Sequence, residues 1–131
     1  MAKLDLSKFL VYSDKNKKNQ SVVSISNSSG RIGFSEYACV SMGLKNCKSA
    51  ILMWNPEQRV IAIKFLQEND SEGALRIQRR ASGIYLCADR FLKKFDIKLK
   101  KTTVYEPEKH EIKGEVYVVI DLNKPIKESN R

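Results

Sequence analysis

Apolar and polar residues alternate over several short runs of the chain, which is the pattern of β-strands that bury one face. In the first half these runs are rich in β-branched and aromatic residues, and turn sequences separate them, "NSSG" at 27–30 and "NPEQ" at 55–58. The strands predicted in this half are 21–26, 31–34, 49–54 and 59–66.

A short helix is predicted between the second and third of these strands. Ser35 is a good N-cap, Glu36 follows it at the positive end of the helix dipole, and Gly43 suits the position after the last turn. The apolar side chains at helical spacing, which we expect to face the core, are Ala38, Cys39 and Met42.

The second half of the chain repeats this order of elements. Gly83 stands 53 residues after Gly30, and each glycine is followed by an apolar pair, by an acid six residues on and by an aliphatic residue fourteen residues on. The predicted elements of this half are strands at 74–79, 84–87, 97–105 and 114–122, a helix at 89–95 and a hairpin loop at 106–113.

This pattern predicts a mainly β fold with short helices (α+β), built from duplicated β-β-α-β-β units. A unit of this size buries little surface and leaves strand edges open, so we expect two units to pair into a swapped-hairpin-like barrel. The predicted domain is 21–122, with repeats at 21–66 and 73–122. Residues 1–20 are expected to form an N-terminal arm and linker, and residues 123–131 a flexible tail.

The lengths of the hydrophobic runs and the number of cysteines indicate the cellular compartment of the protein. The longest apolar runs, 50–54 and 116–120, are much shorter than a membrane-spanning helix, and the first ten residues contain acids and no cleavable apolar block. Cys39, Cys47 and Cys87 are an odd number of cysteines, which favours reduced thiols over a disulfide framework. We therefore expect a cytoplasmic protein with no membrane partner.

The segment "GRIGFSEYACVSMGLKNCKSAILMWNPEQRVIAIKF" resembles the AbrB-type swapped-hairpin DNA-binding regulators. Gly30-Arg31 matches that family's Gly-Arg, Ile32 and Phe34 match its apolar pair, and 42–44 matches the end of its helix. Two copies in one chain resemble the MraZ-like tandem arrangement, and the resemblance covers about residues 21–122. It implies an interlocked barrel that binds DNA.

The chain also departs from that family's pattern. Ser35 stands where the family usually has Pro, and the first helix lacks the arginines that many members carry. In the second copy Ile84 follows the glycine and Asp96 precedes Ile97, in place of Arg and Gly. These departures leave the predicted fold intact and weaken the expectation of operator-type DNA recognition.

Positive charge is concentrated in the second copy. The formal net charge is +9, and residues 73–105 carry nine cations and two aspartates. A basic domain of this kind often binds nucleic acid, and the strand and helix periodicities place these cations on exposed faces, where they would form one positive field. The residues predicted to contact nucleic acid are Arg31, Arg76, Arg79, Arg80, Arg90, Lys93, Lys94, Lys98 and Lys100.

Each of these assignments has a structural alternative. The cations of the helix 89–95 either contact phosphates or form a solvated face above Phe91, Leu92 and Phe95. Arg31 either contacts a phosphate or a base edge, or is an exposed turn arginine. We expect the tyrosines of the strands, Tyr85, Tyr105 and Tyr117, to lie in the core or at its rim.

The sequence contains little that indicates catalysis or a cofactor. His110 is the one histidine and lies in a predicted loop between Lys109 and Glu111. The cysteines have no common zinc-ligand spacing, and the glycines form no Walker or dinucleotide motif. We therefore predict no enzyme, no catalytic residue, no metal and no cofactor.

The leading prediction is a basic nucleic-acid-binding protein, a regulator of transcription that binds duplex DNA through phosphate contacts. The alternative is a protein–protein interaction module, an antitoxin-like or phage-type inhibitor whose basic face binds an acidic partner. Homodimer formation stays open as well.

Overall fold

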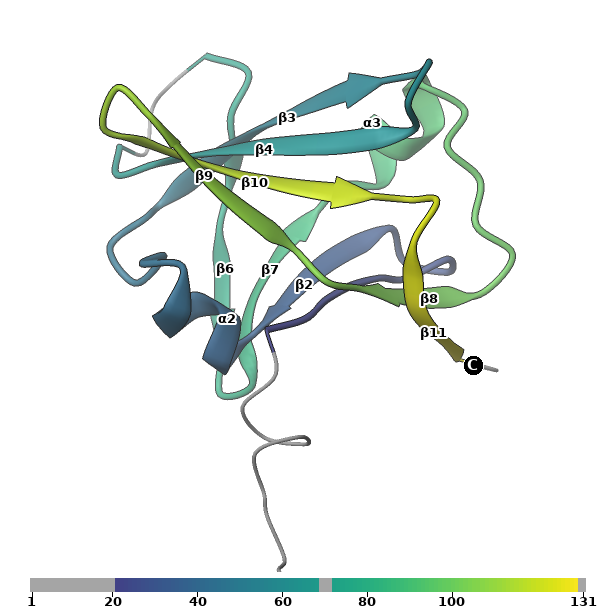
Figure 1. Ribbon diagram of the computed structural model, residues 1–131, viewed down its shortest axis with the longest axis horizontal. Coiled ribbons are helices and arrows are strands. Elements are labelled where there is room, and N and C mark those ends of the chain that lie inside the picture. The colour runs from purple at the N-terminus through teal and green to yellow at the C-terminus, as the bar shows by residue number, and fades with distance from the viewer. Residues whose placement is uncertain (1–20, 69–71, 130–131) are drawn as a thin grey trace, which may run out of the picture.

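Two antiparallel sheets face each other and enclose the core (Figure 1). The computed structural model describes residues 21–68 and 72–129. The predicted mainly β fold with short helices is confirmed. Within the described residues, no helix is long and apolar enough to cross a membrane. The expected N-terminal arm and linker, 1–20, lies outside the described residues.

The first sheet has six strands in the order β11-β8-β1-β2-β7-β6. Val23, Phe34 and Ile84 are register partners on adjacent strands, and all three are buried, so this row faces the core. The strands of this sheet are β1 (Val23–Ile25), β2 (Arg31–Ser35), β6 (Gln78–Arg80), β7 (Gly83–Cys87), β8 (Thr102–Tyr105) and β11 (Pro125–Ser129).

The second sheet has five strands in the order β5-β3-β4-β10-β9. Ile63 of its central strand pairs with Leu52 on one side and Val118 on the other, and this row faces the first sheet. The strands of this sheet are β3 (Ser49–Asn55), β4 (Val60–Leu66), β5 (Leu75–Arg76), β9 (Glu108–Ile112) and β10 (Glu115–Asp121).

The two short helices lie at the predicted places, α2 at Glu36–Ser41 and α3 at Asp89–Lys94. The Ser35 hydroxyl accepts a hydrogen bond from the Ala38 N–H at 3.2 Å, so the predicted N-cap is confirmed. Gly43 takes a φ of 69° just after the helix, as a C′ glycine does. Ala38, Cys39 and Met42 are buried, as predicted.

Two glycines tie the halves of the chain together. A methyl group on Gly30 would lie 2.6 Å from the Cα of Asp89, where α3 begins. A methyl group on Gly83 would lie 2.0 Å from the carbonyl oxygen of Phe34 and 3.1 Å from the nitrogen of Glu36, where α2 begins. Each glycine therefore lies against the first residues of the other half's helix.

The expected closed barrel is wrong, because the two sheets stay open. The chain passes between the sheets four times: between β2 and β3, at Ile77 between β5 and β6, at Pro107 between β8 and β9, and between β10 and β11. Proline has no backbone N–H to donate to a ladder, so Pro107 favours the break after β8, and β9 pairs with β10 instead.

Four predicted segments differ from the structure. The strand predicted at 74–79 is divided at Ile77 into β5 and β6, which belong to different sheets. The loop predicted at 106–113 contains strand β9, and the tail predicted at 123–131 contains strand β11, which pairs with β8. The strand predicted at 97–105 forms only from Thr102, since 97–101 is irregular. In the second helix Leu92 is buried as expected, whereas Phe95 is exposed.

The glycine contact gives a stability test. We expect Gly83→Ala to lower the free energy of unfolding by about 3 kcal/mol or more, because the methyl group meets backbone atoms and φ is 138°. Urea denaturation of the purified variant measures this change.

Gly114→Ala is the matched control. Its φ of 80° is also strained for alanine, yet nothing lies within 4 Å of the added methyl group. We expect a loss of only about 1–2 kcal/mol there. Equal losses at the two positions would contradict the described contact between Gly83 and the start of α2.

Candidate nucleic-acid interface

The outer face of the six-stranded sheet carries two of the predicted arginines. Arg31 of β2 pairs with Cys87 of β7, and Arg80 of β6 pairs with Gly83, which is also in β7. Alternation along β7 puts Tyr85 between these two positions on the outer face, because Ile84 and its neighbours face the core. The register thus brings together arginines that are far apart in sequence.

The Tyr85 ring is held between these arginines. The guanidinium carbon of Arg31 lies 4.7 Å from the ring centroid, and that of Arg80 lies 4.3 Å from it. Both are cation–π distances. Because the two arginines come from the strands on either side of β7, the tyrosine separates two positive charges while it attracts both.

A shallow cavity lies beside this group on the same face. Gly33 pairs with Tyr85 and has no side chain to fill the surface there. The cavity measures about 280 Å³, and Ser24, Gly33, Ser35 and Arg80 are among its lining residues. Hydroxyl groups and a guanidinium at one depression are groups that bind phosphate oxygens.

The outward positions of β1, β2, β6 and β7 carry no acidic residue. They are Ser24, Arg31, Gly33, Ser35, Gln78, Arg80, Gly83, Tyr85 and Cys87. Arg76 is exposed as well, but it lies on β5 of the five-stranded sheet, before the chain crosses at Ile77. Arg31 and Arg80 therefore give the outer face of the six-stranded sheet a positive charge, and we call it the arginine face.

Arg79 lies on the opposite side of the same strand. It pairs with buried Ile84, and its guanidinium donates hydrogen bonds to the carbonyl oxygens of Lys45 at 2.6 Å and Cys47 at 2.7 Å. These contacts fix the loop after α2. Arg79 thus stabilises the fold. The amino-acid sequence gives no sign that its role differs from that of Arg80.

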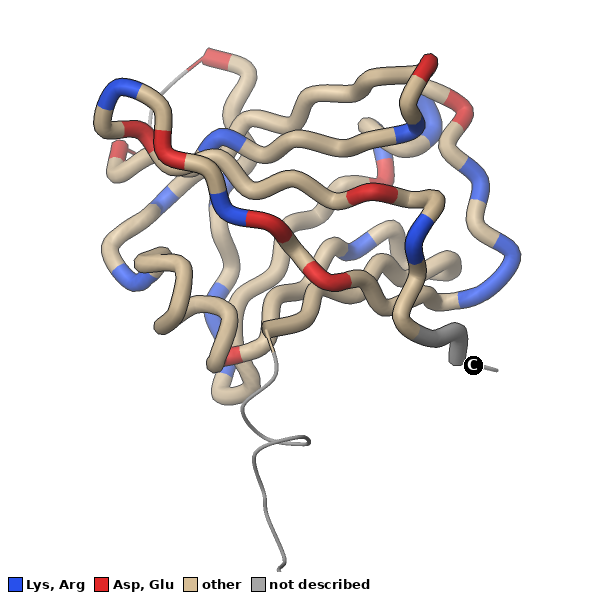
Figure 2. The backbone as a smooth tube through the Cα atoms, in the orientation of Figure 1, with Lys and Arg blue, Asp and Glu red and all other residues tan. Residues whose placement is uncertain are grey.

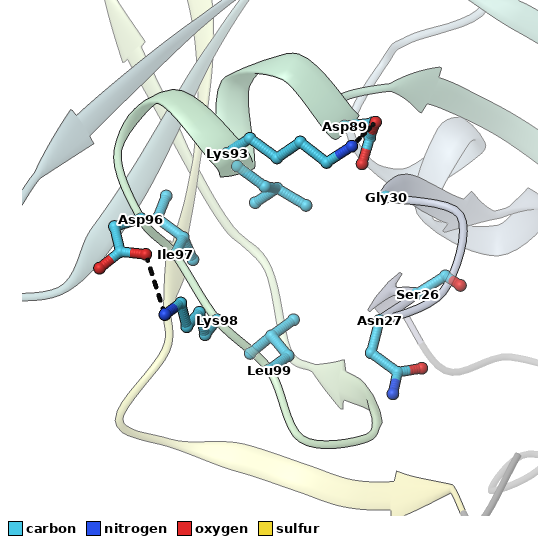
Figure 3. A pocket seen from close by; sticks show the side chains of 10 residues that line it. Ser26, Asn27, Gly30, Asp89, Lys93, Asp96, Ile97, Lys98 and Leu99 are labelled. Atoms are coloured by element: carbon cyan, nitrogen blue, oxygen red, sulfur yellow. Dashed lines mark ion pairs between the residues drawn. The ribbon is translucent and has the colours of Figure 1, made fainter.

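Lys93 and Lys98 are each paired with an acid. The ammonium of Lys93 lies 3.0 Å from the Asp89 carboxylate, and that of Lys98 lies 3.4 Å from the Asp96 carboxylate. Figure 3 shows both pairs at a cavity between the turn 26–30 and the segment 96–99, and neither Arg31 nor Arg80 lines that cavity. These exposed pairs reduce the net charge that the two lysines offer to a ligand.

The other predicted cations lie elsewhere. Arg90 and Lys94 are exposed on α3, and Lys100 is exposed in the irregular segment before β8. Figure 2 shows basic residues spread over several segments, with acidic residues among them. The structure brings together Arg31 and Arg80, with Tyr85 between them, and it does not bring the nine predicted residues into one group.

Sequence reasoning missed Tyr85, Ser24 and Ser35 as site residues. Tyr85 was expected in the core or at its rim, and the available signal was its alternation with buried Ile84 and Leu86. The approach of Arg31 and Arg80 depends on which strand pairs with β7, and no local pattern reveals this.

Chemistry of other kinds is sparse in the described part of the chain. His110 lies on exposed β9, with its Nε2 3.3 Å from a Glu108 carboxylate oxygen. No group of three or more His, Cys, Asp or Glu side chains gathers in the way a metal ion requires. Burial raises the pKa of the Cys39 and Cys47 thiols, while Cys87 is exposed.

The comparisons with known proteins leave the family open. No protein family, no curated protein and no solved structure matches this chain. The resemblance to the AbrB-type regulators is therefore still a prediction from the sequence.

The cysteines offer a test of the described packing. At pH 8 we expect one thiol, that of Cys87, to react with a disulfide reagent about a hundredfold faster than the other two, because only accessible thiolates react. Absorbance of the released thiolate in native protein measures the rates. Cys87→Ser should remove the fast phase, and three thiols reacting at one rate would contradict the burial of Cys39 and Cys47.

Proposed function

We propose that the chain binds nucleic acid through the arginine face, with duplex DNA as the leading target and a regulatory role. The observation that carries the proposal is the group of Arg31, Tyr85 and Arg80 on β2, β7 and β6, whose outward positions carry no acid. Such a face attracts a polyanion, and most of the affinity comes from phosphate contacts.

The geometry favours phosphates over stacked bases. Both guanidinium groups lie near the Tyr85 ring, so the ring already has partners and is poorly placed to stack on a base. The stacked guanidinium groups lose little further side-chain entropy on binding, and their N–H groups can donate to phosphate oxygens. The tyrosine then acts as a spacer that holds two phosphate-binding groups apart.

The DNA-regulator proposal includes the predicted duplication. The β2–β7 register is symmetric under the 53-residue offset, because Arg31 pairs with Cys87 while Phe34 pairs with Ile84. The two glycine contacts are equivalent under the same offset. Two hydrogen bonds at the ends of the helices are also equivalent under this offset. One runs from the Leu44 N–H to the Cys39 carbonyl, and the other from the Ile97 N–H to the Leu92 carbonyl. These pairings support an interlocked, swapped-hairpin-like duplication in two open sheets.

Two cavities support the same equivalence. One lies beside α3 and the other beside α2, and six residues of the first correspond to six of the second under that offset. The first set is Ser26, Asn27, Gly30, Asp89, Leu92 and Lys93, and the second is Arg79, Arg80, Gly83, Glu36, Cys39 and Val40. The side chains that line the two cavities differ, while their positions correspond. This supports a duplication after which the surface residues diverged.

Binding of a labelled random-sequence duplex at several salt concentrations tests the function. We expect log affinity to fall with log salt at a slope near −2, since the two arginines of the face neutralise about two phosphates. Arg31→Glu with Arg80→Glu should reduce the slope by about 2 and weaken binding at low salt. Single-stranded DNA and RNA are titrated alongside to rank the targets.

A control separates this face from general charge. Lys113→Glu with Lys124→Glu changes the net charge equally, and the two lysines lie in the connections before and after β10 of the five-stranded sheet. We expect this variant to keep the wild-type slope. Equal effects of the two double substitutions, with both proteins folded by circular dichroism, would sink the proposed interface.

A second candidate is the protein-interaction module. Tyr37 and Val40 on α2 are 41% and 54% exposed, and Val40 lines a cavity together with Arg80. Exposed aromatic and aliphatic side chains next to arginines are typical of protein interfaces. Absence of nucleic-acid binding at low salt would favour this candidate, with an acidic protein as the partner.

A further inference from the structure

A cavity of about 360 Å³ lies between α3 and the edge of the five-stranded sheet. Its walls are largely apolar: Phe91 and Phe95 of α3 on one side, and Leu52 of β3 and Leu75 of β5 on the other. The volume is in the range of small-molecule sites. Neither the arginine face nor the cavity in Figure 3 includes these residues.

The aromatic wall is built from two rings in edge-to-face contact. Phe91 and Phe95 are one helical turn apart, and their centroids lie 5.3 Å apart at an interplanar angle of 66°. Phe91 packs against the core, whereas Phe95 is 43% exposed. A large apolar side chain left exposed beside a cavity is stabilised when a ligand covers it.

Two cations without acidic partners line the same cavity. Arg90 and Lys94 are also one turn apart on α3, and none of the ion pairs among the described residues involves either. Lys93, on the other side of the same helix, is paired with Asp89. No Asp or Glu is among the residues that line this cavity.

We propose that this cavity binds a small amphipathic anion, a carboxylate or sulfonate with an aliphatic or aromatic body. The apolar walls take the body of the ligand, and Arg90 with Lys94 binds the charged head at the rim. A purely apolar ligand would leave the cations unused, and an inorganic phosphate would leave the leucine and phenylalanine walls exposed. The two features together select a ligand that has both parts.

Octanoate and 1-octanol are the probes that separate these contributions. They have the same chain length and differ in the charge of the head group. In isothermal calorimetry we expect saturable one-to-one binding of octanoate, about tenfold tighter than that of octanol. Amide shifts in a ¹H–¹⁵N spectrum should locate the ligand at α3, β3 and β5.

Paired variants test the role of the cations. Arg90→Gln with Lys94→Gln should lower the affinity for octanoate about tenfold. The affinity for octanol should stay the same, because the apolar walls are unchanged. Lys98→Gln with Lys100→Gln removes the same charge at two positions outside the cavity. This variant should keep the wild-type affinity for both ligands.

Three results would overturn the proposal. They are equal affinities of octanoate and octanol, an unchanged octanoate affinity in the Arg90/Lys94 variant, and no saturable octanoate binding to folded wild-type protein. The last result would favour a protein partner as the occupant of this surface. None of these experiments contains nucleic acid, so their outcome is independent of the arginine face.

Discussion

Two glycines let each half of the chain lie against the start of the other half's helix, and the rest of the fold is arranged around that contact. Gly30 meets Asp89 and Gly83 meets Phe34, Ser35 and Glu36, at distances that leave no room for a side chain. Strands β2 and β7 pair directly between these two contacts. The start of each helix therefore lies against the other half of the chain, and the pairing of β2 with β7 holds the two contacts together.

This constraint fixes Gly83 and Ser35 on the outward side of the strands, and it leaves the positions of Arg31 and Tyr85 free. The inward residues of β1, β2 and β7 are Val23, Ile25, Ile32, Phe34, Ile84 and Leu86, and all are buried. The outward positions of the same strands carry serines, glycines, a tyrosine and Arg31. Arg31 and Tyr85, which carry the proposed binding chemistry, therefore lie at positions that the core does not require, where a sequence can change with little loss of stability.

Much of the fold could be predicted from periodicity. The strands of the first half, both helices and the Ser35 cap follow from local patterns, because each is encoded within a few residues. Strand β9 was missed because its sequence, "EKHEI", is exposed along its whole length and so shows no alternation of burial. The open sheets were missed because they depend on Pro107 and on β9 taking the place beside β10.

The candidate site was harder to predict, because charge gives no information about partners. Arg79 and Arg80 are neighbours in the sequence, yet one donates to two backbone carbonyls and the other stacks on Tyr85. Lys93 and Lys94 are neighbours too, and one has an acid one turn away while the other does not. Strand register and helix position separate these pairs, and both are properties of the folded chain.

The central claim, that the outer face of the six-stranded sheet binds the phosphate backbone, is tested most directly by mapping the contact on the folded protein. The measurement is a ¹H–¹⁵N titration of the full chain with an unlabelled duplex of about 16 base pairs at low salt. The account predicts that the largest shifts fall on amides of β2, β6 and β7, together with the Arg31 and Arg80 side-chain resonances. Shifts confined to the five-stranded sheet, or no shifts at all, would contradict it.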